Sequence, residues 1–286
     1  MKTPPRLEPL VEDGLIDGVL RQLKSGKEAT VFLVTRGEET LCAKVYKDLD
    51  RRSFRQAVTY REGRKVRSSR LARAMEKGSR FGKHEQQDQW QVHEVNALYR
   101  LAAAGVRVPR PYGCFDGVLL MEMIADDDGD VAGRLADFEF SPEEALDFHS
   151  RLVREVVRML CAGLVHGDLS EFNILVDAGG PVIIDLPQAV DAAANNHARA
   201  ILARDVENLK AFFGQYAPEL LDTDFAGEIW DLYERGELTP ESKLRGEFVR
   251  NEEPADVDDL LRQIQDVIAE ENARKAREAA GDEDAP

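Results

Sequence analysis

The amino-acid sequence predicts an α+β fold of two lobes, in which a β-rich N-terminal lobe precedes a mainly helical C-terminal lobe. Short apolar runs separated by turn residues fill the chain up to residue 124, whereas helical apolar stripes dominate from residue 141 onward. Between them lies the acidic run 126–130, whose composition is typical of a hinge. The predicted parts are a flexible lead-in at 1–14, an N-terminal lobe at 15–124 with a basic insertion at 51–84, a C-terminal lobe at 125–255, and an amphipathic helix with a charged tail at 256–286.

Composition limits the class of protein. The chain has 286 residues, of which 43% are hydrophobic, and a net charge of −16. A core can therefore form, and bulk binding to nucleic acid or anionic membranes is disfavoured. The three cysteines, Cys42, Cys114 and Cys161, are widely spaced and indicate reduced thiols of a cytosolic protein. No apolar run approaches the length of a membrane span, so we expect a cytoplasmic protein without membrane contact.

The N-terminal lobe begins with predicted strands at 18–23, 30–34 and 41–46. The first two flank a loop of small residues that contains Ser25 and Lys27, and the backbone N–H groups of such a loop can cover phosphates. Its single glycine is equally typical of an ordinary hairpin turn. Further strands are predicted at 106–111 and 117–124, followed by the acidic hinge. Where the chain crosses between the lobes, backbone groups of Glu122 and Ile124 are candidates to bind an adenine edge.

A helix is predicted from Asp88 to residue 104, and its apolar stripe carries one carboxylate, Glu94. A carboxylate on an apolar face requires a buried cation. Lys44 of the third strand is the candidate, and the ion pair would direct its ammonium towards the α- and β-phosphates of a nucleotide. The alternatives are a Glu94 that reaches solvent at the margin of the stripe and a Lys44 that belongs to an exposed strand edge.

The segment from Arg51 to Lys83 reverses the sign of the charge, with many Arg and Lys residues and only two acidic ones, Glu62 and Glu76. Two interpretations carry similar weight. The segment is a solvated insertion, or it binds RNA phosphates, a ribosomal particle or an acidic partner. Aromatic residues are sparse within it, and it contains no RNA-binding motif.

The C-terminal lobe begins with a long helix that has Ser141 as N-cap, Pro142 at its first position and Glu144 completing a capping box. Its predicted buried stripe consists of Leu146, Leu152, Val153, Val156, Val157 and Leu160. Later helices are predicted up to residue 213, at 228–233, and as an amphipathic stripe at 257–268.

Residues 165–186, VHGDLSEFNILVDAGGPVIIDL, hold the candidate site. Two apolar strands flank the turn DAGG, and pairing about its centre places Asn173 opposite Asp185. An amide oxygen and a carboxylate at one point suit Mg²⁺. Asp168 precedes Asn173 with the spacing D-x-x-x-x-N, in which kinase-type sites use one Asp for the nucleophile's proton and the Asn and a second Asp for the metal. The alternative is a polar loop beside a stable hairpin. His166 is expected to be a structural hydrogen-bonding residue.

With these residues the chain resembles the RIO family of atypical serine/threonine protein kinases. The matching motifs are SGKEA, AKVYK, LLMEMI, LVHGDLSEFNILV, IIDLPQAV and RDVENL, spread from about residue 17 to residue 213. The resemblance implies an abbreviated two-lobe protein-kinase-like fold without a long activation segment or peptide-docking helices. No Ala-Pro-Glu follows Asp185, in agreement with this, and the subgroup implied is the one without an N-terminal winged-helix domain.

The resemblance also implies roles for individual residues. Asp168 would be the catalytic Asp and Asn173 and Asp185 the Mg²⁺ ligands. The remaining residues would bind ATP: Ser25 and Lys27 in the phosphate loop, Lys44 paired with Glu94, and Glu122 and Ile124 at the hinge. RIO-like proteins are associated with ribosome maturation and act partly as ATPase switches, and in that scheme Asp185 itself accepts phosphate. Ser170 stands where ordinary kinases carry a Lys that contacts the γ-phosphate, and this loss of charge disfavours transfer to a protein hydroxyl.

We therefore predict an ATP- and Mg²⁺-dependent kinase or ATPase, whose substrate is an unknown protein or the chain itself. A small-molecule kinase of the aminoglycoside type is the enzymatic alternative, because such enzymes also carry HGD, N and D. They usually have an aromatic residue after the metal-binding Asp, where this chain has Leu186. The non-enzymatic alternative is a nucleotide-gated scaffold that binds a ribosomal particle through the segment from Arg51 to Lys83.

Overall fold

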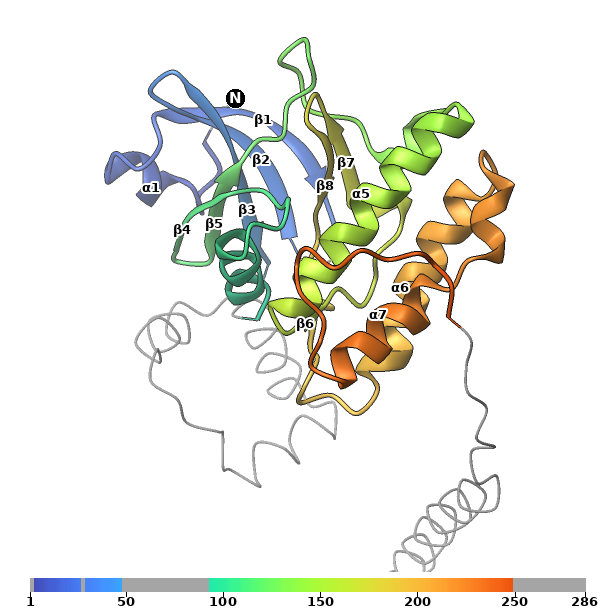
Figure 1. The fold of residues 1–286 in the computed structure, drawn as a ribbon. Coiled ribbons are helices and arrows are strands. Elements are labelled where there is room, and N and C mark those ends of the chain that lie inside the picture. Colours follow the sequence, from blue (N-terminus) through green and yellow to red (C-terminus); the bar gives the residue numbers. More distant parts are fainter. Residues whose placement is uncertain (1–2, 27–28, 48–92, 249–286) are drawn as a thin grey trace, which may run out of the picture. The chain divides into compact units, whose positions relative to one another are not determined.

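The computed structural model describes residues 3–26, 29–47 and 93–248, which all lie within one compact unit, Met1–Phe248. Its first part is an antiparallel sheet and its second part is mainly helical, so the predicted α+β class is confirmed (Figure 1). Several expectations lie outside the described residues: Lys27, the basic segment from Arg51 to Lys83, the start of the helix at Asp88, and the stripe at 257–268. The lobe boundary near residue 124 stays a prediction.

The sheet has five strands in the order β1-β2-β3-β5-β4. Its neighbouring strands run antiparallel. The strands are β1 Gly18–Ser25, β2 Ala29–Arg36, β3 Glu39–Tyr46, β4 Pro111–Phe115 and β5 Val118–Glu122. The predictions at 18–23, 30–34, 41–46 and 117–124 are thus confirmed, with ends shifted by a few residues. Helical residues 93–103 connect through 104–110 to β4.

The predicted strand at 106–111 is wrong, because β4 begins only at Pro111. The backbone of Arg107 explains the difference. Its N–H donates to Oε2 of Glu155 at 2.9 Å, and its carbonyl accepts from the N–H of Ile183 at 2.8 Å. The polar groups of this segment are therefore satisfied outside the sheet.

The expectation of a flexible lead-in is also corrected, because α1 (Glu8–Glu12) forms within it. Leu7 and Leu10 are buried and belong to one apolar cluster with Phe32 and Val34 of β2. Covering this face of the sheet removes apolar surface from water, and that burial holds an otherwise short helix in place.

The helical part contains α5 Pro142–Cys161, α6 Ala198–Phe213 and α7 Phe225–Glu234, with short strands β6 Leu164–Val165 and β9 Val190–Asp191. The α5 capping box is present as predicted, since Ser141 accepts from the Glu144 N–H while Glu144 accepts from the Ser141 N–H. Leu146 was wrongly assigned to the buried stripe: it is 36% exposed, and Ala145 and His149 are buried instead. The buried face is one residue out of phase with the predicted one at this end of α5.

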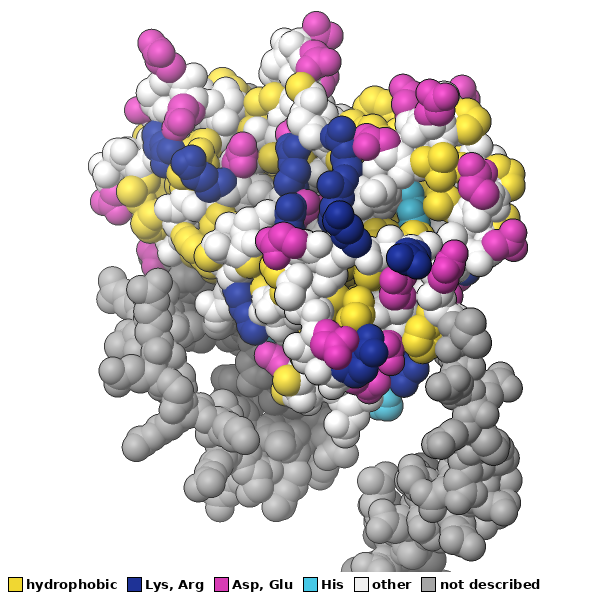
Figure 2. Space-filling view, in the orientation of Figure 1, with side chains coloured by type: hydrophobic (Ala, Val, Ile, Leu, Met, Phe, Trp, Pro, Cys, Tyr) yellow, Lys and Arg dark blue, Asp and Glu magenta, His cyan; other side chains and the backbone are white. Residues whose placement is uncertain are grey.

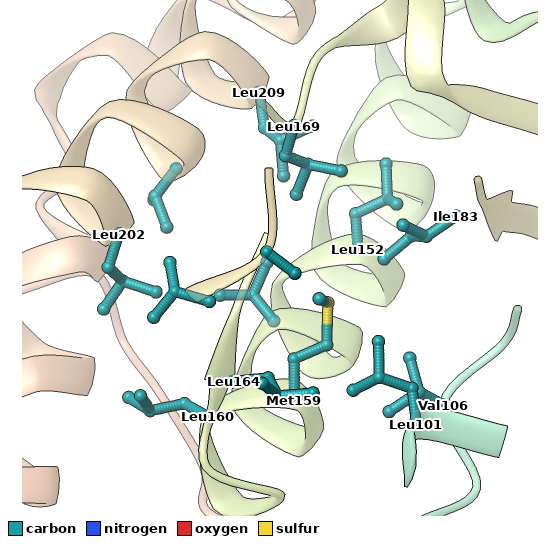
Figure 3. Packing of buried hydrophobic residues seen from close by; sticks show 14 of the residues in the cluster. Leu101, Val106, Leu152, Met159, Leu160, Leu164, Leu169, Ile183, Leu202 and Leu209 are labelled. Carbon is teal, nitrogen blue, oxygen red and sulfur yellow. The ribbon is translucent and has the colours of Figure 1, made fainter. Parts of the chain in front are cut away.

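The largest apolar cluster joins the helices to the elements that carry the candidate site (Figure 3). Leu152, Met159 and Leu160 of α5 pack there with Leu202 and Leu209 of α6. Leu169 and Ile183, which border the predicted catalytic loop and hairpin, belong to the same cluster. Close packing of this kind resists local rearrangement, so the loop and hairpin are held against a rigid support.

His149 gives the core a predicted pH dependence. It lies buried between Phe213 and Phe225, at ring-centroid distances of 5.9 and 5.3 Å, and its Nε2 has no hydrogen-bond partner among the described residues. Burial lowers the pKa of His149 from 6.5 to about 4. Between these values the unfolded chain binds the proton more strongly, so stability is full above the unfolded pKa and falls as pH decreases towards 4.

Chemical unfolding measured from pH 7 to pH 4 should therefore show that this residue costs the wild type about 2–3 kcal/mol. His149→Leu should flatten that part of the profile. Burial also lowers the pKa of His166, so some dependence of the same sign remains in the variant. Parallel profiles for the two proteins would contradict the assignment.

Charge is distributed unevenly over the surface. On the face drawn in Figure 2, Lys and Arg side chains gather near the middle, whereas acidic side chains lie mostly around the edge. Among the residues that the structure describes, no helix is long and apolar enough to cross a membrane.

Candidate active site

A cavity of about 640 Å³ lies between the sheet and the β7–β8 hairpin (β7 Ile174–Asp177, β8 Gly180–Ile183). Its walls include Gly26, Ala29, Val31 and Cys42 of the first three strands and Leu186 beyond the hairpin. Six of the residues selected from the sequence line it: Lys44, Glu94, Glu122, Ile124, Asn173 and Asp185. The cavity therefore brings together residues that are far apart in the chain.

Lys44 is the cation expected for Glu94. Its ammonium forms an ion pair with Oε1 of Glu94 and lies 3.3 Å from Oδ1 of Asp185. Burial by itself lowers the pKa of Lys44, but the charges of Glu94 and Asp185 outweigh burial and raise it overall. Lys44 thus stays protonated and links the third strand to the helix at 93–103 and to the hairpin.

Tyr46 completes this group and was missed at the level of sequence. Its hydroxyl donates to Oε2 of Glu94 at 2.8 Å, so both oxygens of that buried carboxylate are occupied. Burial, followed by the charge of Glu94, raises the pKa of Tyr46, which keeps the hydroxyl a donor. Strand alternation could have indicated it, because residues 44 and 46 of a strand share one face.

The predicted register of the hairpin is wrong by one residue. Asp177 pairs with Gly180, so the turn consists of residues 178 and 179 alone. The Ile184 N–H donates to the Asn173 carbonyl at 3.0 Å, and Asn173 therefore lies opposite Ile184 instead of Asp185. The side chain of Asp177 accepts the N–H of Gly179 at 2.8 Å, which stabilises the tighter turn.

Asp185 nevertheless reaches the same cavity as Asn173. Strand β8 ends at Ile183, and Asp185 adopts a left-handed backbone conformation with φ of +67°. Beyond the strand the alternation of side chains no longer applies, so the one-residue slip does not send Asp185 to the opposite face. A positive φ at a residue other than glycine carries strain, which is typical of functional positions.

Asn173 also joins the metal-ligand candidates to Asp168. Its Nδ2 donates to the Asp168 carbonyl at 2.9 Å and to the Asp168 side-chain Oδ2 at 3.2 Å. The amide nitrogen is thereby used, which leaves the amide oxygen for another ligand. Asp168 itself is exposed, as a group that receives a substrate's proton has to be.

The donor set fits a hard cation bound together with phosphates. Asn173 and Asp185 offer one amide and one carboxylate, and Mg²⁺ typically takes one or two such protein ligands and completes its shell with water and phosphate oxygens. No cluster of three or more His, Cys, Asp or Glu residues able to hold a metal occurs in the described part of the chain. A metal held by protein alone is thus not supported there.

Asp205 of α6 braces the loop around Asp168, and the sequence did not reveal this role, although its RDVENL motif had been noted. Its carboxylate accepts the Gly167 N–H at 2.7 Å and the Leu169 N–H at 3.1 Å. Asn208 supports the same loop by donating to the Leu169 carbonyl at 2.9 Å. Burial raises the pKa of Asp205, partly offset by these hydrogen bonds. A buried Asp on a helix that is otherwise amphipathic is the signal that could have identified it.

We expect Asp205→Asn to destabilise the fold by about 1–3 kcal/mol, because the amide NH₂ would face one of two buried backbone N–H donors. Turnover should fall as well, since Asp168 lies between the two braced residues. Thermal unfolding and steady-state rates check this, with the exposed Asp222→Asn as a matched control. Wild-type stability and rate in Asp205→Asn would show that the brace is dispensable.

At the other end of the cavity, Glu122 ends β5 and Ile124 follows it. The Glu122 N–H already donates to the Arg110 carbonyl at 2.9 Å, and the Ile124 carbonyl accepts from Ala132 at 2.9 Å. Ser25 ends β1 next to Gly26, which lines the cavity.

Comparison with known proteins places these residues within one family model. The model described as RIO domain matches residues 30–226. The RIO-type serine/threonine-protein kinase Rio1 of Haloferax volcanii is 37% identical over 207 residues, covering 71% of this chain and 66% of that protein. The serine/threonine-protein kinase rio1 of Schizosaccharomyces pombe is 31% identical over 71% of this chain and 40% of its own length. For RIO1 of Homo sapiens the values are 30%, 71% and 34%. The aligned region is thus less than two thirds of each of these relatives.

Proposed function

The chain belongs to the RIO domain family, and on this premise we propose that it catalyses ATP-dependent phosphoryl transfer as a RIO-type serine/threonine protein kinase, an ATPase switch, or both. The observation that carries the proposal is the position of Lys44. Its ammonium is held between Glu94 and Asp185 inside a cavity that also contains Asn173, the direct partner of Asp168.

Each residue has one task in this proposal. Asn173 and Asp185 hold Mg²⁺, which neutralises charge on the phosphates when bound. Lys44, fixed by Glu94 and Tyr46, orients the α- and β-phosphates. The Ile124 N–H and the Glu122 carbonyl receive the adenine edge, because their companion groups are already bonded within the protein.

Asp168 accepts the proton of the attacking hydroxyl. The hydroxyl oxygen then forms a bond to the γ-phosphorus while the bond from that phosphorus to the β,γ-bridging oxygen breaks, and ADP leaves with the bridging oxygen. Asn173 keeps the carboxylate of Asp168 in place through its 3.2 Å hydrogen bond. Positioning of this kind supplies most of the rate enhancement in phosphoryl transfer.

Water is the second candidate acceptor, and Ser170 favours it. Position 170 offers no cation to the γ-phosphate, so transfer to a protein hydroxyl lacks one source of charge stabilisation. Slow hydrolysis that reports a bound state would then be the main activity. In the same scheme Asp185 could carry the phosphate transiently as an aspartyl phosphate.

The partners and the cellular location remain proposals from the sequence. The basic segment from Arg51 to Lys83 supports binding to RNA or a ribosomal particle, because its positive charge stands out in a chain of net charge −16. The reduced cysteines support a cytoplasmic location. Charge reversal in the segment should abolish particle binding but leave ATP hydrolysis intact if it is a contact surface.

The function is tested by incubating the full chain with ATP labelled at the γ-phosphate, alone and with candidate proteins. Acid-stable label indicates phosphoserine or phosphothreonine, hydroxylamine-sensitive label indicates phosphoaspartate, and free phosphate alone indicates an ATPase. Small alcohols and aminoglycosides are screened in the same assay. Efficient labelling of an aminoglycoside would replace the proposal by the small-molecule kinase alternative, and no turnover under any condition would reject it.

A further inference from the structure

A second lysine, Lys47, lies just beyond the end of β3 and contacts the turn between β1 and β2. We propose that Lys47 is a positioning residue that fixes the Ser25–Gly26 corner of this turn at the phosphate end of the cavity. The inference rests on the proposed function, since it assigns a task to Lys47 in binding the triphosphate. It extends the site beyond the residues that line the cavity.

The turn is already closed by its own backbone. The Gly26 N–H donates to the Ala29 carbonyl at 2.9 Å, so the amide of this glycine is occupied and cannot also bind a phosphate oxygen. The side chains of Ser25 and Thr30 approach each other to 3.3 Å across the same pair of strands. The expectation that backbone N–H groups of this loop cover the phosphates therefore does not hold for Gly26, and the remaining groups depend on where the corner sits.

Lys47 determines that position through two contacts. Its ammonium donates to Oγ of Ser25 at 3.2 Å and to the carbonyl of Gly26. Both acceptors are uncharged, and no ion pair of Lys47 is present among the residues that the structure describes. Lys44, by contrast, has its charge balanced by Glu94 and Asp185. A charged donor makes stronger hydrogen bonds than a neutral one, so this brace is well suited to hold an exposed turn.

The two lysines thus divide the work along β3. Lys44 points into the cavity and is fixed by acidic partners, whereas Lys47 holds the wall above the phosphates. Without Lys47 the turn would have to be ordered when a triphosphate binds, which weakens binding by the entropy of ordering it. A ligand without phosphates does not reach the turn and should be unaffected.

The experiment compares Mg·ATP and adenosine binding to the full chain by calorimetry. Lys47→Met should weaken Mg·ATP binding roughly 3- to 10-fold and leave adenosine binding unchanged, the size expected for lost hydrogen bonds to a charged group. Lys47→Arg should recover most of the affinity, because a guanidinium can still donate to both acceptors. Lys243→Met, the same change at an exposed site in the C-terminal part, should bind both ligands as the wild type does. Thermal unfolding monitors folding of every variant.

A double-mutant cycle with Ser25→Ala separates positioning from a direct effect of charge. If Lys47 acts through the corner, the two substitutions are non-additive for Mg·ATP affinity. Additive effects, an equal loss of adenosine binding, or wild-type affinity in Lys47→Met would each overturn the inference. A wild-type chain that binds no nucleotide at all would instead refute the proposed function, so the two failures are distinguishable.

Discussion

Asp168→Ala should reduce turnover of ATP by about 10²–10⁴-fold, the usual contribution of a positioned general base. Nucleotide affinity should change little, because Asp168 is exposed and does not belong to the cavity walls. Asn173 would lose its 3.2 Å hydrogen bond to the carboxylate but keep the 2.9 Å bond to the backbone carbonyl of the same residue. The ligand set for Mg²⁺ is thereby retained. Rates from labelled γ-phosphate and affinities from calorimetry measure the two effects separately.

Asp222→Ala, an exposed substitution of the same kind, is the matched control and should retain the wild-type rate. Full hydrolysis by Asp168→Ala would refute the assignment of this residue. A loss of nucleotide affinity equal to the loss of rate would show that Asp168 supports the site as a whole instead of acting on the proton.

Asp185→Ala should lower both the affinity for Mg·ATP and the rate, each by about tenfold or more, since the variant loses a carboxylate ligand of the metal. The dependence on Mg²⁺ makes this prediction specific. Without Mg²⁺, removal of a negative charge from the phosphate site should leave ATP affinity unchanged or improve it. Lys44 keeps its ion pair with Glu94 in the variant, so the cavity should stay formed.

Titrations of the variant with ATP at several Mg²⁺ concentrations provide the measurement. An equal loss of affinity with and without Mg²⁺ would indicate that Asp185 holds the fold or Lys44 and does not bind metal. Asp222→Ala again serves as the control, and its response to Mg²⁺ should match that of the wild type.

Local patterns in the sequence predicted the parts of the site that depend on chemistry at short range. The capping box of α5 follows from Ser141 and Glu144 alone, and the turns between the first three strands follow from their polar residues. The contact between Lys44 and Glu94 could be predicted although the residues are far apart, because a carboxylate on an apolar helix face requires one particular kind of partner.

Features decided by packing could not be predicted in this way. The segment DAGG permits either of two turns that differ by one residue, and only contacts around the hairpin select the shorter one. Asp205 and Tyr46 are identified by what they bond in three dimensions, namely the loop of Asp168 and the second oxygen of Glu94. Leu146 lies one residue away from the true buried face of α5, a phase that its neighbours on α6 and α7 determine.

The position of Arg107 has a mechanical consequence. Its backbone is bound to Glu155 of α5 and to Ile183 of β8, and its guanidinium forms an ion pair with Asp177 at 2.6 Å. The sheet is therefore attached to the helical part twice, once through the chain after β5 and once through this arginine. Two attachments define an axis, so the cavity opens and closes by rotation about that line, and free separation of its walls is prevented.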